Sequence, residues 1–149
     1  MSSNVEHDGI VVHHSLTNDG TVKDWPAIRR YHMQENGWAD IGYHYGVEET
    51  PDGVAIMAGR RLGTLGAHTK GHNSMIGICV AGNYDLGPAP EDHLHALVHL
   101  VLALLGEYTS MTPDDIHRHS EYAQKSCPGK LFQWDEFMKR VRAGWKGRA

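Results

Sequence analysis

Short apolar runs and longer apolar repeats alternate along the chain. Residues 10–12 are β-branched and are followed by two histidines, which is typical of a buried strand that carries polar groups to its end. Residues 24–36 indicate a helix, because Pro26 suits its first turn and Gly37 follows as a stop signal. The first quarter of the chain is therefore predicted to form a strand followed by a helix.

The rest of the chain continues this alternation. Residues 43–48 and 54–57 are predicted to be strands, because the Thr-Pro-Asp-Gly sequence between them is a strong hairpin turn signal. Residues 76–80 form another apolar run typical of a buried strand, whereas residues 90–108 and 131–145 carry apolar side chains at helical spacing. This order predicts an α/β fold in which about three helices flank a central mixed sheet.

Length and composition limit the possible architecture and partners. The 149 residues contain no internal repeat or linker, so we expect one domain spanning residues 1–149 and a monomer. The net charge of -4 argues against a nucleic-acid partner, which requires a dense basic surface. No apolar run approaches the ~20 residues that cross a bilayer, and residues 1–9 lack a signal-peptide pattern. We therefore expect synthesis in the cytoplasm without a signal peptide.

Histidine is unusually frequent, with 12 in the chain, and a polar segment at residues 117–129 combines it with cysteine. A catalytic zinc takes three protein ligands from His, Cys and carboxylate and leaves its fourth position to water. His119 and Cys127 from this segment, with His13 from the end of the first strand, complete such a set. The sequence therefore predicts one Zn²⁺ per chain.

Two further side chains suit the hydrolysis of an amide at this metal. Lys125 lies two residues before Cys127 and can reach the oxyanion that forms at an attacked carbonyl. Tyr43 can add a second hydroxyl donor or pass a proton to the leaving amine. Arg60 either pairs with a free carboxylate of the substrate, for which its forked guanidinium is suited, or is a solvated turn residue.

Several residues of similar chemistry have simpler interpretations. His14 must point to the opposite face of the strand from His13, so we interpret it as a packing residue. His95 and His99 lie four apart on a predicted helix, but no HExxH pattern accompanies them. For Cys127 the competing interpretation is a nucleophilic cysteine paired with a histidine.

Five motifs occur along the chain in a fixed order, at residues 13–15 (HHS), 42–45 (GYHY), 58–60 (AGR), 66–73 (GAHTKGHN) and 119–128. In this order they resemble the second type of N-acetylmuramoyl-L-alanine amidase. That superfamily also contains the peptidoglycan recognition proteins and short, single-domain phage amidase lysozymes, or endolysins, to which the chain is most similar. The resemblance implies an amidase domain with zinc in a surface groove.

The resemblance also implies roles for individual residues. The zinc ligands of the family correspond to His13, His119 and Cys127, and its catalytic residues to Tyr43 and Lys125. The family hydrolyses the amide between N-acetylmuramic acid and the L-alanine of the stem peptide in peptidoglycan.

His68 and Asn73 correspond to residues that line the groove and bind substrate. The loop at residues 72–75 is one residue shorter than usual in the family.

Three functions fit these features. The first is a phage or prophage endolysin that acts on the cell wall in the periplasm. The second is a cytoplasmic amidase that recycles muropeptides, and the third is a non-catalytic peptidoglycan-binding or regulatory protein. The basic side of the last predicted helix also suggests weak contact with an outer membrane, through Lys139, Arg140, Arg142 and Lys146.

Overall fold

The computed structural model describes residues 5–15 and 25–146. Its centre is a five-stranded mixed sheet. The strands are β1 (Ile10–His14), β2 (Tyr45–Thr50), β3 (Gly53–Ala58), β4 (Ile76–Val80) and β5 (Ile116–Arg118). Their order across the sheet is β3-β2-β4-β1-β5. Only β2 and β3 pair in antiparallel fashion, as the predicted hairpin requires, whereas β4 and β5 both run parallel to β1. The predicted α/β class and mixed sheet are confirmed.

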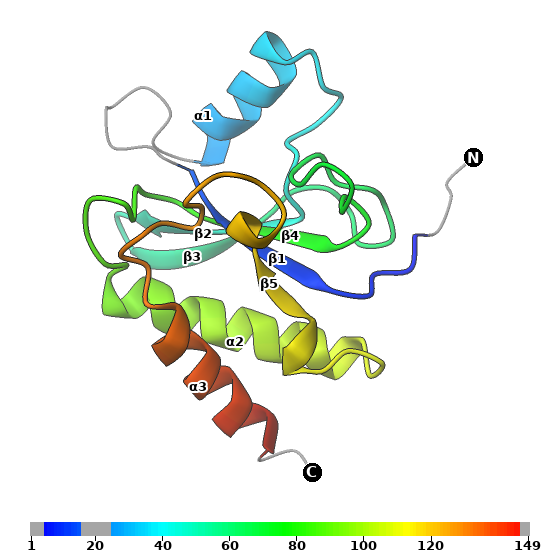
Figure 1. Ribbon diagram of the computed structural model, residues 1–149. Helices are drawn as coiled ribbons and strands as arrows, with labels where there is room; N and C mark the ends of the chain where they lie inside the picture. The colour runs from blue at the N-terminus through cyan, green and yellow to red at the C-terminus, as the bar shows by residue number, and fades with distance from the viewer. Residues whose placement is uncertain (1–4, 16–24, 147–149) are drawn as a thin grey trace.

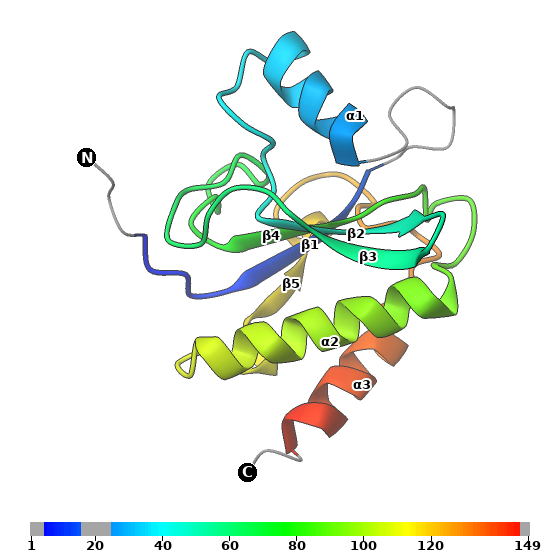
Figure 2. The ribbon, with the colours of Figure 1, turned by 180° about the vertical axis from the view of Figure 1, so that it is seen from behind.

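Helices cover both faces of this sheet (Figure 1). On one face lies α1 (Trp25–Arg30), which continues into a wider π-helical turn at Tyr31–Glu35 before Gly37 ends it with a φ of 72°. On the other face lie α2 (Glu91–Glu107) and α3 (Trp134–Lys146), as Figure 2 shows from behind. Short 3-10 turns follow α2 and β5, at Pro113–Asp115 and His119–Glu121. No helix among the described residues is long and apolar enough to span a bilayer.

Two elements start two or three residues later than the sequence predicts, and one strand was missed. The second strand begins at Tyr45, so that Tyr43 lies in the connection that precedes it. The last helix begins at Trp134, because residues 129–133 form turns instead of its first turn. The strand β5 was not predicted, since only three residues form it. The residue at position 24, the predicted start of the first helix, lies outside the described part of the chain.

The two central strands are buried over their whole length. Every residue of β1 and β4 is buried, as expected for parallel strands covered on both faces. Eight residues of α2 pack onto one face, together with Phe137 and Val141 of α3. Parallel strands place their carboxyl ends at the same edge of a sheet, which is where α/β proteins bind ligands. The end of β1 and the segment that follows β5 therefore meet at this edge.

Candidate metal centre

Three donors from three segments converge at the carboxyl edge of the sheet. His13 comes from the end of β1, His119 opens the turn that follows β5, and Cys127 comes from the loop beyond it. One ligand atom from each lies within 4.8 Å of the others. His13 Nδ1 lies 3.7 Å from Cys127 Sγ, and the rings of His13 and His119 are 4.5 Å apart. The structure thus brings together the three residues predicted to bind zinc.

Strand alternation separates His13 from its neighbour. The ring of His14 turns to the opposite face of β1, where its Nδ1 accepts a hydrogen bond of 3.0 Å from the Tyr84 backbone N–H. The backbone N–H of His14 donates to Cys127 Sγ at 3.3 Å. His14 therefore supports the cysteine through its backbone, and its ring packs away from the cluster, as the sequence predicted.

Burial keeps all three donors neutral when no cation is bound. It lowers the pKa of His13 well below the usual value, with the nearby His68 and His119 adding to the effect, and it also lowers the pKa of His119. Burial raises the pKa of the Cys127 thiol to about 12. Two neutral imidazoles and one thiol that a divalent cation would deprotonate are a donor set that fits zinc.

The same environment argues against a nucleophilic cysteine. A thiol attacks as its thiolate, and catalytic cysteines lie where a cation or a helix end lowers the thiol pKa. Here burial raises it, and the neighbouring His13 resists protonation because it is buried. The cysteine–histidine interpretation of Cys127 is therefore disfavoured by the site itself.

The Tyr43 ring faces this cluster from the segment before β2. Its centroid lies 5.2 Å from that of His13. Burial raises the pKa of Tyr43 well above 10, and the thiols of Cys79 and Cys127 add to this. The phenol is therefore protonated at neutral pH, in the neighbourhood of the Cys79 and Cys127 thiols.

Lys125 is exposed on the loop that carries Cys127. Its positive charge contributes to the lowered pKa values of His13 and His119 and partly offsets the raised pKa of Cys127. The ammonium group therefore acts electrostatically on all three candidate ligands.

The predicted substrate residues make hydrogen bonds within the protein. Asn73 Oδ1 accepts hydrogen bonds of 2.8 Å from the backbone N–H groups of His68 and Thr69. Arg60 donates from Nε to the Ile41 carbonyl oxygen at 2.8 Å, and from its guanidinium to that of Leu65 at 3.0 Å. A contact between these side chains and a substrate stays a prediction.

A cavity of about 320 Å³ opens next to these residues. It is lined by Trp38, Ala67, His68, Thr69, Lys70, Gly71 and Asn73. Thr69 had no role predicted from the sequence, yet its Oγ1 lies 3.1 Å from His13 Nε2. Its position within the motif at residues 66–73 is the only sequence signal that pointed to it.

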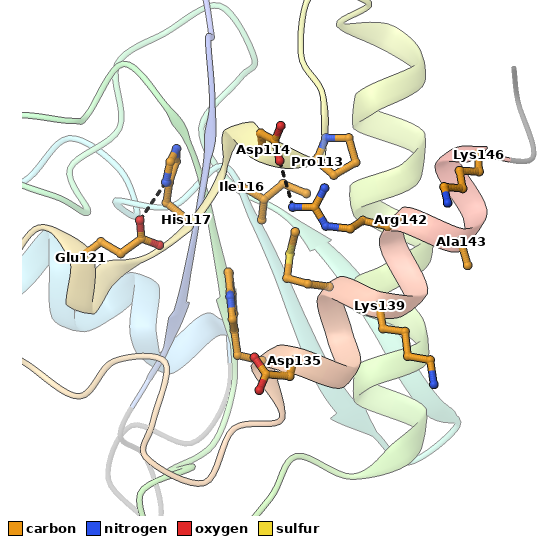
Figure 3. Close-up of a pocket in the computed structure, with 12 residues that line it drawn as sticks. Pro113, Asp114, Ile116, His117, Glu121, Asp135, Lys139, Arg142, Ala143 and Lys146 are labelled. Atoms are coloured by element: carbon orange, nitrogen blue, oxygen red, sulfur yellow. Dashed lines mark hydrogen bonds and ion pairs between the residues drawn. The ribbon is translucent and has the colours of Figure 1, made fainter.

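A larger cavity of about 790 Å³ lies between α3 and the segment around β5 (Figure 3). Arg142 pairs with Asp114 across it at 2.9 Å, and His117 pairs with Glu121 at 3.0 Å. None of its lining residues is a candidate zinc ligand.

Two of the four basic residues suggested for membrane contact are ion-paired within the protein. Arg140 binds Glu91 and Glu136, and Arg142 binds Asp114.

Other histidines lack the geometry of the main cluster. The rings of His95 and His99 meet edge to face on α2, with centroids 4.4 Å apart, but they belong to no group of three donors among the described residues. Glu49, Asp92 and His93 do form such a group, in which both carboxylates are exposed. Asp92 there forms a hydrogen bond of 2.8 Å with the ring of His93, its neighbour in the chain, which accounts for the arrangement.

Comparison with known proteins assigns the chain to a family. The N-acetylmuramoyl-L-alanine amidase profile matches residues 3–130, which include all three candidate ligands. The chain belongs to this amidase family. The enzyme activity that the resemblance implied is therefore assigned to this chain, which is an N-acetylmuramoyl-L-alanine amidase.

Individual relatives agree with this assignment over most of their length. The amidase is 34% identical to the endolysin of Klebsiella phage KP32 over 138 residues, which cover 88% of this chain and 87% of that one. It is 34% identical to the endolysin of Escherichia phage T7 over 137 residues, or 87% and 85% of the two chains. The solved amidase LysC from Clostridium intestinale superimposes with a TM-score of 0.80 at 29% identity, covering 94% and 88%.

Proposed function

We propose that this amidase is a zinc-dependent endolysin that cleaves the bond between N-acetylmuramic acid and L-alanine in peptidoglycan. His13, His119 and Cys127 hold the single zinc of a monomeric chain. The observation that carries the proposal is the convergence of two neutral imidazoles and one buried thiol at the sheet edge, within 4.8 Å of one another. The host-lysis role rests on the two phage relatives, both of which are endolysins.

Zinc held by such a set polarises a carbonyl oxygen and lowers the pKa of a water molecule toward neutrality. Tyr43 supplies a protonated phenol beside the metal position and donates to the oxygen on which negative charge develops. Lys125 supplies a cation at the exposed side of the cluster, where the same negative charge is stabilised electrostatically. The cavity lined by Trp38 and by residues of the segment 67–73 receives part of the substrate.

Digestion of purified sacculi tests the reaction. The products are expected to carry new L-alanine amino termini and no new reducing sugar ends, as read by mass spectrometry. New reducing ends would identify a glycosidase and refute the proposal. Faster cleavage of soluble anhydromuropeptides than of intact sacculi would instead support a recycling amidase, and binding without cleavage a recognition protein.

Metal content and matched variants test the roles of individual residues. The purified chain is expected to carry about one zinc, the stoichiometry of one catalytic site. Cys127→Ala should lose zinc and activity together, whereas Lys125→Ala should keep zinc and lose rate. Cys79→Ala is the matched control for zinc content, since Cys79 is also buried but lies outside the donor cluster. Full activity of both Cys127→Ala and Lys125→Ala would contradict the assigned roles.

A further inference from the structure

Hydrogen-bonding groups surround the Nε2 atom of His13, the ring nitrogen that does not face Cys127. His13 Nε2 is 3.0 Å from His68 Nδ1 and 3.1 Å from Thr69 Oγ1. Thr69 Oγ1 is in turn 2.9 Å from His68 Nδ1. His13 and Thr69 are both 2% exposed, so water does not substitute for these partners.

The positions of the protons follow from one carbonyl group. The Met75 carbonyl oxygen, 2.9 Å from His68 Nε2, can only accept, so His68 carries its proton on Nε2 and presents a lone pair at Nδ1. The Thr69 hydroxyl donates to that lone pair and accepts from His13 Nε2–H. Each group in the series then donates one proton, and no donor is left without an acceptor.

This series leaves His13 with its proton on Nε2 and a free lone pair on Nδ1. Nδ1 is the nitrogen that lies 3.7 Å from Cys127 Sγ, on the side of the candidate metal position. The partner of one ring nitrogen decides which tautomer a histidine adopts, and therefore which nitrogen can bind a metal.

We propose that Thr69 and His68 are positioning residues that fix the tautomer and ring orientation of His13 for zinc. The inference rests on the proposed zinc site and deepens it. It also gives His68 a different task from the substrate contact expected from the sequence. Both of its ring nitrogens already have partners within the protein, at Met75 and at the pair formed by Thr69 and His13.

The surrounding chain holds the two positioning residues rigidly. Asn73 Oδ1 binds both of their backbone N–H groups. The His68 ring packs against Gly77 so closely that a Cβ at that position would lie 2.4 Å from it. A rigid partner is what orienting a ligand requires, because the ring of His13 is held only as firmly as the groups behind it.

Zinc affinity, measured by competition with a chromophoric chelator, tests the proposal without reference to activity. Thr69→Val removes the hydroxyl at nearly constant volume, and His68→Phe removes both ring nitrogens. Each variant is expected to bind zinc about 10- to 100-fold more weakly, the range found when partners of metal-binding histidines are replaced. Thr69→Ser should keep most of the affinity. Thr64→Val is the matched control, because the Thr64 hydroxyl binds the Arg61 carbonyl away from the cluster.

Nitrogen NMR of the imidazole groups gives a second readout that a purely structural role would not change. In the metal-free wild-type chain His13 is expected to carry its proton on Nε2, and to populate both tautomers in the double variant Thr69→Val with His68→Phe, which removes both partners of that nitrogen. Wild-type zinc affinity in both Thr69→Val and His68→Phe would overturn the inference while leaving the zinc amidase intact. Equal weakening by Thr69→Ser and Thr69→Val would overturn the role of the hydroxyl. A wild-type chain that binds no zinc would overturn the proposed function together with this inference.

Discussion

Replacement of Asn73 by alanine is expected to destabilise the fold, and the size of the effect follows from two hydrogen bonds. Asn73 Oδ1 accepts from the backbone N–H groups of His68 and Thr69, each at 2.8 Å. Leaving one buried donor unsatisfied costs about 1–3 kcal/mol. Because the segment borders an open cavity, water reaches part of it, so we expect a total loss of about 2–4 kcal/mol.

The loss is measurable as a shift in melting temperature. Unfolding entropy of about 2.1 cal/mol/K per residue gives about 0.3 kcal/mol/K for this chain, so the variant should melt about 10 °C lower. Calorimetry or circular dichroism of the metal-free protein measures this shift without any contribution from zinc binding. Asn73→Asp keeps an acceptor for both N–H groups and is expected to lose much less.

Asn36→Ala is the matched control, because Asn36 is exposed at the end of the helix that begins with α1. It should change the melting temperature by no more than a typical surface substitution, within about 0.5 kcal/mol. If Asn73→Ala melted like Asn36→Ala and lost only activity, Asn73 would be a substrate contact and not a support for the loop. That result would refute the reasoning.

Three other perturbations test the packing and the charge state of the interior. Gly77→Ala places a Cβ 2.4 Å from the buried ring of His68 and should lower stability by about 1–3 kcal/mol and weaken zinc binding; unchanged zinc affinity would show that the ring can move. Phe137→Ala empties a fully buried position and should cost about 3–5 kcal/mol in urea unfolding, whereas a loss below 1 kcal/mol would mean that the helix repacks. Burial lowers the pKa of His44 to about 4, whereas in the unfolded chain it is near 6.5, so the unfolded state alone binds this proton between those values. The free energy of unfolding should therefore fall as the pH falls from 6.5 toward 4, and His44→Gln should reduce the slope by about 1.4 kcal/mol per pH unit; an unchanged slope would refute this assignment.

Local pattern was enough to predict the strands and helices whose signal lies within one segment. The strand at Ile76–Val80 and the hairpin after Tyr45 follow from apolar runs and one turn sequence. The strand β5 could not be predicted in this way, because it exists through its pairing with β1 and offers three residues of unremarkable composition. The last helix starts at Trp134 and not at residue 131, because residues 131–133 are not helical.

The residues of the site likewise divide into those with a local sequence signal and those that only the fold brings together. Strand alternation separated His13 from His14, and the chemistry of the loop singled out His119 and Cys127, because both signals are local. The arrangement of Thr69 and His68 behind His13 joins residues 55 and 56 positions apart, so no spacing in the sequence reveals it. A resemblance can name such residues, but only the fold determines which atoms they bind.

Burial has opposite consequences for this centre with and without a metal. It holds His13 unprotonated and keeps Cys127 as a thiol, so the metal-free cluster contains no charged donor that must be buried. Zinc binding then converts the thiol into a thiolate whose charge the metal compensates. Without a metal, the fold still has to bury the polar ring nitrogens of His13. Thr69 and His68 offset this cost at Nε2 by hydrogen bonding to it. One short segment thus supports the metal-free fold and prepares the ligand geometry, so substitutions there should lower the stability of the metal-free protein and its zinc affinity together.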